Sequence, residues 1–368
     1  MIVRSVILKS YRNYKSQQVS FGKNLNVVVG KNAQGKTNLI EAIFLCAIGK
    51  SPRVNKDKDL ILWGEGLSKI ELNVEKLSGS KKIEIYLSKD NTKIVKINGV
   101  PIKKIGELMG VFNAIYFSPD ELKLVKEAPD ERRRFMDIDL SQFNKRYFYT
   151  LSKYNKILAQ RNKLLKDTIN AKVLADTLPI WNEQLAVVAS YIIKCRIELI
   201  EQLKVHTKTV MHYLTDEKEN VELSYVGIAG DSEEEIKNKL LEGYAKSLEK
   251  DIKLRYTTVG PHRDDFKIVV NNIDIRNFGS QGQQRTCALA LKLAELESFY
   301  ARIGEYPVLL LDDVLSELDP QRQAKLLSYV GKVQTILSGT EFGFDIAYNR
   351  IVVENGEVIG NKVVRLLA

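Results

Sequence analysis

The sequence predicts an α/β fold in which both ends of the chain build a mixed sheet flanked by helices, around an inserted helical domain. Strand-like alternation runs through residues 1–29 and 68–105. The pattern then becomes helical and rich in charged residues, and strands return from about residue 252. We therefore expect residues 1–118 and 252–368 to form one domain, with residues 119–251 inserted as a short, coiled-coil-like helical arm.

The N-terminal part is expected to contain strands around one helix, which runs from about Lys36 to Ile48. Asn98-Gly99 lies between two short apolar runs and predicts a tight hairpin. The strands are expected at 3–11, 16–21, 25–29, 68–77, 81–88 and 93–102.

Two apolar stripes in the middle of the chain predict a pair of antiparallel helices, joined by a turn within residues 171–179. Each stripe has the spacing 4, 3, 4, 3, 4, which covers about three heptads. An ordinary helical subdomain without coiled-coil character explains the pattern almost as well. The stripes are Tyr147, Leu151, Tyr154, Leu158, Arg161, Leu165 and Trp181, Leu185, Val188, Ile192, Cys195, Leu199.

The C-terminal part is expected to resume the sheet. Strands are predicted at 252–259 and 266–275, and a helix then opens at GSQGQQR (279–285). The apolar strand in YPVLLLDD (306–313) precedes a strand–helix–strand alternation that runs to residue 368.

The charge and the cysteine content limit the partners and the cellular compartment that we expect. The formal net charge of +10 suits a polyanionic partner such as nucleic acid, although a lysine-rich surface explains it equally well. The three cysteines, Cys46, Cys195 and Cys287, are far apart, which argues against disulfides or a zinc site and fits the reducing cytosol. We find no signal peptide or membrane-spanning run, and we expect a cytoplasmic protein without a membrane role of its own.

GKNAQGKT (30–37) follows the apolar strand 25–29 and opens a helix, which is the context that a phosphate-binding loop requires. Its glycines allow backbone N–H groups to face phosphate oxygens, and the helix N-terminus adds partial positive charge. Lys36 is expected to reach the β- and γ-phosphates, and Thr37 to offer its hydroxyl to Mg²⁺. The nucleotide-binding residues expected here are Gly30, Lys31, Asn32, Ala33, Gln34, Gly35, Lys36, Thr37 and Asn38.

Two carboxylates follow the apolar strand near residue 308. We expect Asp312 to support the Mg²⁺ shell and Asp313 to position water or act as a general base, so the expected catalytic residues are Asp313, Asp312 and Lys36. A strand that ends in an acidic turn is the structural alternative.

GSQGQQR raises the question of why a second glycine-containing polar loop is present. Taken by itself, this loop is explained by simple helix capping. The order of P-loop, long insertion, Ser-x-Gly, Asp-Asp and then SELD (316–319) nevertheless resembles the layout of ABC-type ATPase heads. That resemblance implies that Ser280, Gly282 and Gln283 contact the nucleotide of an opposing subunit, so that ATP drives formation of a homodimer.

Three kinds of head have this layout: transporter subunits, chromosome-structuring ATPases and compact repair proteins. Ser280 lies 244 residues after Lys36, which is too few for a long coiled coil and more than transporters use. Thr340 stands about where a transporter would have histidine. A transporter energy subunit and a head ATPase that regulates a nuclease remain as alternatives.

The chain resembles the RecF family of bacterial recombination mediators over nearly its whole length. Ala33 and Pro52 are small departures, since the family often has glycine and a bulkier residue there. The resemblance rests on GKNAQGKTNLIEAI (30–43), SPRVNKDKDLILWG (51–64), FSPDELKLVKEAPDERRRFMD (117–137), VGPHRDDF (259–266), GSQGQQRT (279–286) and LLLDDVLSELD (309–319).

The resemblance implies a DNA-binding ATPase that recognises gapped DNA and single-strand/double-strand junctions. With RecO and RecR it would place RecA on single strands during gap repair, replication restart and SOS induction. It also implies weak, DNA-stimulated ATP hydrolysis that resets an ATP-dependent dimer. Transporters usually have glutamate where Asp313 stands, and we attribute part of the slow hydrolysis to the shorter side chain.

Other candidates are weighed against structural roles. Arg53 resembles a position that lies over the base or ribose in related heads. ERRRF (131–135) fits salt bridging at the junction of arm and head better than DNA contact, and VGPHRDDF fits an internal polar network beside the nucleotide or the dimer interface. Lysines 56, 58, 81 and 82 are expected on a solvated face, with contact to DNA as the alternative. DNA should be bound through its phosphate backbone and without sequence preference.

Overall fold

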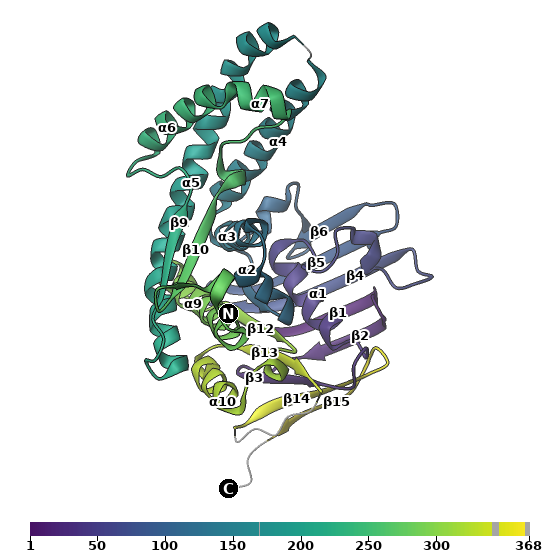
Figure 1. The fold of residues 1–368 in the computed structure, drawn as a ribbon. Helices are drawn as coiled ribbons and strands as arrows, with labels where there is room; N and C mark the ends of the chain where they lie inside the picture. Colours follow the sequence, from purple (N-terminus) through teal and green to yellow (C-terminus); the bar gives the residue numbers. More distant parts are fainter. Residues whose placement is uncertain (169, 341–345, 365–368) are drawn as a thin grey trace. The chain divides into compact units, whose positions relative to one another are not determined.

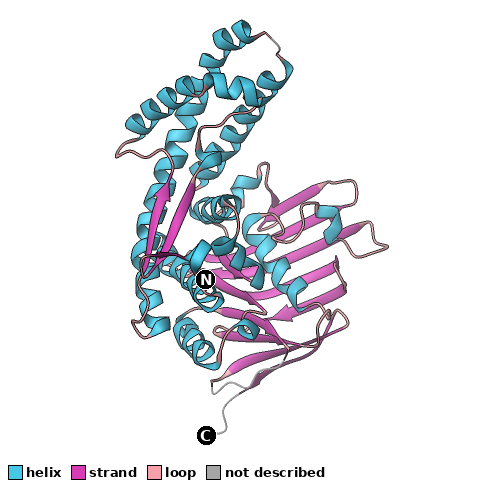
Figure 2. Cartoon of the chain, viewed as in Figure 1, coloured by secondary structure: helices cyan, strands magenta, loops and turns pink. Residues whose placement is uncertain are grey.

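The computed structural model describes residues 1–168, 170–340 and 346–364 (Figures 1 and 2). They form two compact units. The first comprises Met1–Leu122, Tyr213–Glu217 and Ala288–Ala368, and the second comprises Lys123–His212 and Lys218–Cys287. Within the described ranges, no helix is long and apolar enough to cross a membrane.

The first unit contains an antiparallel sheet of order β2-β1-β4-β5-β6-β7. The predicted hairpin is confirmed, because Asn98 and Gly99 both have positive φ and join the last two strands. Its strands are β1 (Ile2–Tyr11), β2 (Tyr14–Ser20), β4 (Leu67–Lys76), β5 (Gly79–Ser88), β6 (Lys93–Ile97) and β7 (Val100–Pro101).

The second sheet of this unit is mixed, as predicted, and has the order β15-β14-β3-β13-β12-β8. All neighbours are parallel except the C-terminal hairpin β14–β15. The prediction placed a strand–helix–strand alternation here and missed this hairpin; residues 365–368 lie outside the described residues. The strands are β3 (Leu25–Val29), β8 (Ala114–Phe117), β12 (Val308–Asp312), β13 (Thr335–Gly339), β14 (Tyr348–Glu354) and β15 (Glu357–Val364).

Helix α1 (Lys36–Ile48) packs against strands of both sheets, and its bounds agree with the prediction. Nine consecutive residues, 39–47, are buried, so the helix is covered on every side and lacks the polar face of a surface helix. The other helical segments of this unit are η1 (Asp57–Leu60), η2 (Ile105–Glu107), η3 (Pro119–Leu122), α10 (Pro320–Tyr329), η5 (Leu315–Glu317), η6 (Val330–Lys332) and most of α9 (Gln281–Ile303).

The second unit is mainly helical, with one small antiparallel sheet of order β11-β10-β9. Its helices are α2 (Lys123–Lys126), α3 (Pro129–Phe143), α4 (Lys145–Asp167), α5 (Ala171–Thr215, with its end in the first unit), α6 (Glu233–Lys246), α7 (Leu248–Leu254), η4 (Pro261–Arg263) and α8 (Ile275–Phe278). Its strands are β9 (Val221–Val226), β10 (Asp265–Val270) and β11 (Ile273–Asp274).

The predicted antiparallel helix pair is present as α4 and α5. Arg161 bonds Asn182 near one end and Arg196 bonds Tyr147 near the other, so sequence position rises along one helix as it falls along its neighbour. Both predicted stripes lie on the inner faces, since every member is buried or half-buried.

The predicted turn at residues 171–179 is wrong, because these residues are the first turns of α5, with Pro179 inside the helix. A proline in a helix costs about 3 kcal/mol. Leu174 and Leu178 are fully buried against Leu165, and each buried leucine contributes roughly 1.5–3 kcal/mol. Burial of this apolar face therefore outweighs the cost of the proline.

Two further expectations for the second unit fail. Residues 252–259 were expected as a strand, but α7 extends to Leu254 and ends where Arg255 takes a left-handed conformation. Strand β9 lies inside the region expected to be helical, and it pairs with β10 over six residues. This pairing joins residues 221–226 to 265–270, so residues 252–287 belong to the helical unit and the compact units do not coincide with the boundary expected at 251/252.

Buried arginine–carboxylate pairs hold the second unit together. Arg161 is fully buried, bonds Asp251 at 2.8 Å and Thr257 at 2.8 Å, and so ties α4 to α7 and the segment after it. Arg196, also buried, contacts Asp137 at 2.8 Å and Asp264 at 3.1 Å. Removing one partner of such a pair would leave an uncompensated buried charge, which typically costs about 3–5 kcal/mol.

Within this polar network, the pKa of His262 is lowered and the pKa of Asp264 is raised. Burial lowers the pKa of His262 to about 4, while its ring accepts a hydrogen bond from Tyr154 at Nδ1 and donates one to the Thr257 carbonyl. Burial raises the pKa of Asp264 to about 6, against the opposing charge of Arg196. The contribution of His262 to the free energy of unfolding therefore falls as pH falls from about 6.5 to 4. The contribution of Asp264 instead falls as pH rises from about 4 to 6.

We predict that His262→Gln makes the protein less sensitive to acid. The free energy of unfolding of the variant, relative to wild type, should rise as pH falls from 6.5 to 4, by at most about 1.4 kcal/mol per pH unit. Urea unfolding across this range measures it, with His206→Gln as the control because His206 lies on α5, distant in sequence from Thr257, His262 and Asp264. Parallel curves for wild type and His262→Gln would contradict the prediction.

Candidate nucleotide-binding site

The phosphate-binding loop lies between β3 and α1, where two other parts of the first unit approach it. A Cβ on Gly30 would lie 2.2 Å from the Val353 carbonyl oxygen, so β14 leaves room only for glycine. Gly35 has φ 118° and lies against Asn13, and Ala33 has φ 65°. Glycine adopts such a left-handed backbone more readily than alanine does, so Ala33 carries a small conformational cost at this position.

Lys36 directs its ammonium group back over the loop. Its Nζ donates to the carbonyl oxygens of Gly30 at 2.6 Å and Lys31 at 2.9 Å. Burial lowers the pKa of Lys36, and the carboxylates of Asp313 and Asp312 oppose this shift. The cation therefore lies inside the loop and close enough to both carboxylates to interact with them.

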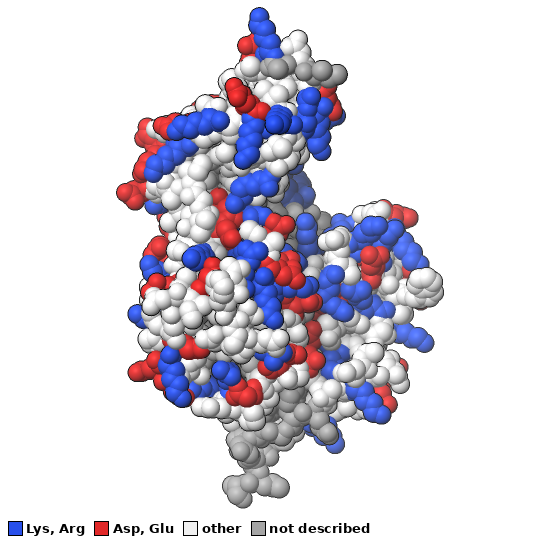
Figure 3. Space-filling model, in the orientation of Figure 1, with Lys and Arg blue, Asp and Glu red and all other residues white. Residues whose placement is uncertain are grey.

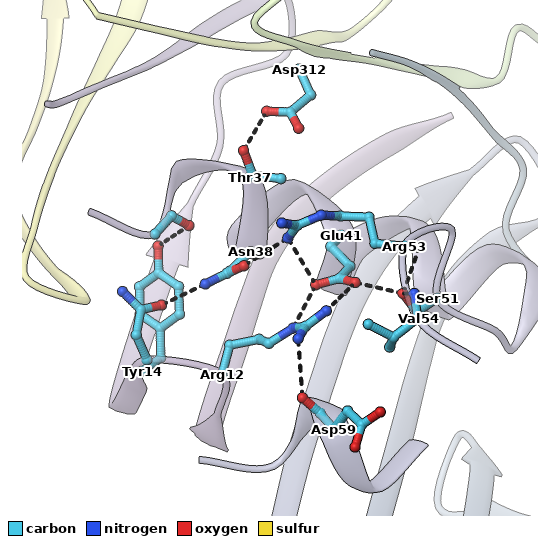
Figure 4. Close-up of polar contacts among 12 residues, drawn as sticks. Arg12, Tyr14, Thr37, Asn38, Glu41, Ser51, Arg53, Val54, Asp59 and Asp312 are labelled. Atoms are coloured by element: carbon cyan, nitrogen blue, oxygen red, sulfur yellow. Dashed lines mark hydrogen bonds and ion pairs between the residues drawn. The ribbon is translucent and has the colours of Figure 1, made fainter. Parts of the chain in front are cut away.

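Three parallel strands, β3, β13 and β12, end at the same edge of the mixed sheet, and this brings Thr37 and Asp312 together. The Thr37 hydroxyl donates to Asp312 Oδ1 at 3.0 Å (Figure 4). The same oxygen accepts from Ser338 at 2.5 Å, and Oδ2 accepts from Tyr116 at 3.2 Å. The buried carboxylate is thus fixed by three hydroxyl groups, two of which sequence reasoning missed.

Asp313 follows directly and has φ 55°, in the left-handed region. Its backbone N–H donates to Ser338, at 3.1 Å to the hydroxyl and 3.2 Å to the carbonyl. Aspartate and asparagine tolerate this conformation better than other side chains apart from glycine. Backbone conformation therefore favours aspartate over glutamate here. In the following SELD segment, Asp319 caps α10 by accepting from the Arg322 backbone N–H at 2.9 Å.

Arg53 lies close to the phosphate-binding loop. Its guanidinium donates to Asn38 Oδ1 at 3.0 Å and lies 3.6 Å from Glu41, and 42% of its side chain is exposed (Figure 4). Asn38 in turn donates to Asn13 at 2.9 Å. Of the predicted site residues, this part of the structure brings together those of the P-loop, Arg53, Asp312 and Asp313.

Sequence reasoning missed a clamp on Gln34. Its backbone carbonyl accepts from Asn13 Nδ2 at 2.9 Å and from the Gly356 N–H at 3.0 Å, and its side-chain oxygen accepts from the Asn355 N–H at 2.6 Å. Asn355 and Gly356 both have positive φ and form the tip of the β14–β15 hairpin. The Asn-Gly pair could have identified this turn, but nothing in the sequence places it against the P-loop.

Ser280, Gly282 and Gln283 lie in the second compact unit. The Ser280 hydroxyl accepts from the Gln283 N–H at 3.2 Å, and the Gln283 side chain accepts from the Ser280 N–H at 3.1 Å. This reciprocal pair is a capping box for α9, so the structural alternative stated for GSQGQQR is present. A Cβ on Gly282 would meet nothing closer than 4.0 Å, and its φ is not positive.

The two charged motifs have structural roles within the second unit. Arg132 is buried and donates to Asp265 through Nε and Nη2, and Arg133 donates to the Asp264 carbonyl at 2.7 Å and pairs with Asp130. The structural interpretation of ERRRF is thus confirmed for these two arginines, and VGPHRDDF forms the polar network described above.

Of the four lysines considered for DNA contact, Lys82 is paired with carboxylates, and Lys81 is half-buried. Lys82 lies 3.0 Å from Glu71 and 3.9 Å from Glu84, while Lys56 and Lys58 are exposed. Lys and Arg are interspersed with Asp and Glu on the face shown in Figure 3.

A family model described as the RecF/RecN/SMC N-terminal domain matches residues 2–338. The DNA replication and repair protein RecF of Clostridium perfringens (strain SM101 / Type A) is 46% identical over 340 residues, which cover 92% of this chain and 93% of the relative. That of Clostridium acetobutylicum is 42% identical over 366 residues, covering 97% and 99%.

Solved structures give the same result. A structure of the recombination mediator protein RecF with ATP in the RecFOR pathway has a TM-score of 0.88 and 36% identity, covering 99% of this chain and 97% of that one. An SMC head bound to the C-terminal winged-helix domain of ScpA has a TM-score of 0.59 and 15% identity, covering 100% and 98%, and indicates a shared fold alone. The expected fold class, an ABC-type head with an inserted helical part, is confirmed.

We predict that Gly356→Ala both destabilises the protein and weakens nucleotide binding. The new Cβ would lie 2.2 Å from the Asn13 carbonyl oxygen, so the hairpin tip must move and release Gln34. Gly99→Ala is the matched control, because Gly99 has φ 81° against 76° but its Cβ would meet nothing within 4 Å. Both should lose about 1 kcal/mol from the left-handed backbone, as measured by thermal unfolding. Only Gly356→Ala should also raise the dissociation constant for a fluorescent ATP analogue, and equal dissociation constants would contradict the role of the clamp.

Proposed function

The chain belongs to the RecF/RecN/SMC N-terminal domain family, and to the RecF proteins within it, and from this premise we propose that it is an ATP-switched recombination mediator. In this proposal it binds ATP and Mg²⁺, dimerises on ATP at gapped DNA or single-strand/double-strand junctions, and acts with RecO and RecR to load RecA. Slow hydrolysis resets the dimer.

The observation that carries the nucleotide proposal is the contact between Thr37 and Asp312. A hydroxyl and a carboxylate 3.0 Å apart, at the end of a P-loop, form an oxygen donor set suited to Mg²⁺, which prefers few protein ligands plus phosphate oxygens and water. Thr37 and Asp312 would hold the ion, which would neutralise charge on the phosphates. The solved relative described as bound to ATP supports the choice of nucleotide.

Lys36 and Asp313 would act on the phosphates and on water. The ammonium of Lys36, now paired with loop carbonyls, would turn to the β- and γ-phosphates. Asp313 would accept a hydrogen bond from the attacking water, with its carboxylate held by the anchored backbone. Because the left-handed backbone favours the shorter side chain, we attribute part of the slow hydrolysis to Asp313.

Gly282 supports use of the second loop by another copy of the chain. A glycine in the first turn of a helix costs stability relative to alanine, by about 1 kcal/mol at most. Neither its backbone conformation nor the space around it in its own chain requires glycine. We therefore attribute the presence of glycine at this position to the close approach of a group from outside the chain, such as a phosphate held by an opposing subunit.

DNA binding is proposed to be led by the phosphate backbone. The net charge of +10 favours a polyanion. The roles of RecO and RecR rest on the pathway to which the solved relatives belong.

Light scattering of Asp313→Asn, which slows turnover while keeping a side chain tolerant of the left-handed backbone, tests the dimer switch. We expect a monomer without nucleotide, a dimer with ATP and Mg²⁺, and tighter association with a gapped duplex. Adding Ser280→Arg should restore the monomer. A monomer under every condition would overturn the dimer mechanism.

We further predict that Gly282→Ala separates stability from function. The variant should be as stable as wild type or up to about 1 kcal/mol more stable, while ATP-dependent dimerisation is lost. Gly331→Ala is the control, since its Cβ also meets nothing within 4 Å but it lies away from the second loop in sequence. Thermal unfolding and light scattering measure both quantities. If Gly282→Ala still dimerises with ATP, the space beside Gly282 is not needed for contact with an opposing subunit.

A further inference from the structure

We propose that Glu41 is a positioning residue that presents Arg53 to the bound nucleotide. The inference rests on the proposed ATP site and goes beyond it, because neither Glu41 nor its partner Arg12 belongs to the phosphate-binding motif. The side chain of Glu41 is fully buried, one helical turn after Thr37.

One face of the Glu41 carboxylate is committed to Arg12. Nε of Arg12 donates to Oε2 at 2.9 Å and Nη2 donates to Oε1 at 2.8 Å, which is a bidentate pair (Figure 4). Nη1 of Arg12 donates to the Asp59 carbonyl at 3.0 Å. With 18% of its side chain exposed, Arg12 is fixed in place and neutralises the buried carboxylate.

The same carboxylate fixes the backbone that carries Arg53. Oε1 of Glu41 accepts a hydrogen bond of 2.5 Å from the Ser51 hydroxyl. The Ser51 oxygen in turn accepts from the backbone N–H groups of Arg53 at 3.0 Å and Val54 at 3.1 Å. Glu41 therefore determines the path of residues 51–54 after α1 through a single intermediate hydroxyl.

The side chain of Arg53 is held more loosely. It lies 3.6 Å from Oε2 of Glu41 and donates to Asn38, the residue directly after Thr37. Two guanidinium groups share one carboxylate, so a net positive charge remains on the more exposed member, Arg53. A loosely held, exposed cation beside a P-loop suits the negatively charged nucleotide, whereas a bidentate partner such as Arg12 does not turn away without exposing a buried charge.

A purely structural role for Glu41 makes a different prediction. If Glu41 only holds the β1–β2 turn to α1, its loss lowers stability and affects nucleotide binding independently of Arg53. If it positions Arg53, the two residues act on affinity as one unit, and their effects are not additive.

A double-mutant cycle distinguishes these roles. Full-length wild type, Glu41→Gln, Arg53→Ala and the double variant are titrated with a fluorescent ATP analogue and Mg²⁺, and thermal unfolding is measured for each. We expect each single substitution to raise the dissociation constant about tenfold, and the double variant to bind no more weakly than Arg53→Ala. Ser51→Ala should reproduce the binding defect, and Ser51→Thr, which keeps the hydroxyl, should restore binding.

Asp251→Asn is the control for lost stability, because it removes another fully buried carboxylate that pairs with an arginine, in the second compact unit. It should lower the unfolding temperature and leave nucleotide affinity unchanged. If the increases in the dissociation constant caused by Glu41→Gln and Arg53→Ala multiply in the double variant, the positioning role of Glu41 is overturned and the proposed function is unaffected. A wild-type protein that binds no ATP analogue would overturn the proposed function, and the inference with it.

Discussion

The first compact unit depends on the alignment of three parallel strands. Because β3, β13 and β12 run in register, Val29, Gly339 and Asp312 all reach the same edge of the sheet. The loop proposed to bind phosphate, a hydroxyl of the central strand and a carboxylate then converge without any adjustment elsewhere. The buried Asp312 is tolerable only because three hydroxyl groups donate to it.

Both units use the same device to order irregular backbone. A buried carboxylate binds an arginine, and the remaining lone pairs fix a nearby loop: Glu41 holds Ser51 in one unit, and Asp251 holds Thr258 in the other. Replacing such pairs by apolar groups often changes stability little, so their value lies in specificity of conformation. We attribute the fixed backbone path of residues 51–54, in an otherwise irregular segment, to this device.

The sequence allowed local features to be predicted where a residue type has one physical use. The P-loop, α1, the Asn98-Gly99 hairpin and the buried strand before Asp312 all follow from short patterns. The start of α5 could not be predicted, because Pro179 is a strong local signal that burial of Leu174 and Leu178 overrides. The clamp on Gln34 and the partners of Glu41 depend on contacts between distant segments, for which a single sequence holds no signal.

The position of the β14–β15 hairpin has a consequence for biosynthesis. Gly30 is shaped by Val353, and β3 acquires both of its neighbours in the sheet only from residues beyond 334. During translation, the P-loop therefore leaves the ribosome roughly three hundred residues before the strands that support it. The nascent chain lacks these supports for the loop until β13 and β14 have been made, and closing such distant contacts makes this step slow. A finished phosphate-binding loop thus requires that the chain has been made past β14.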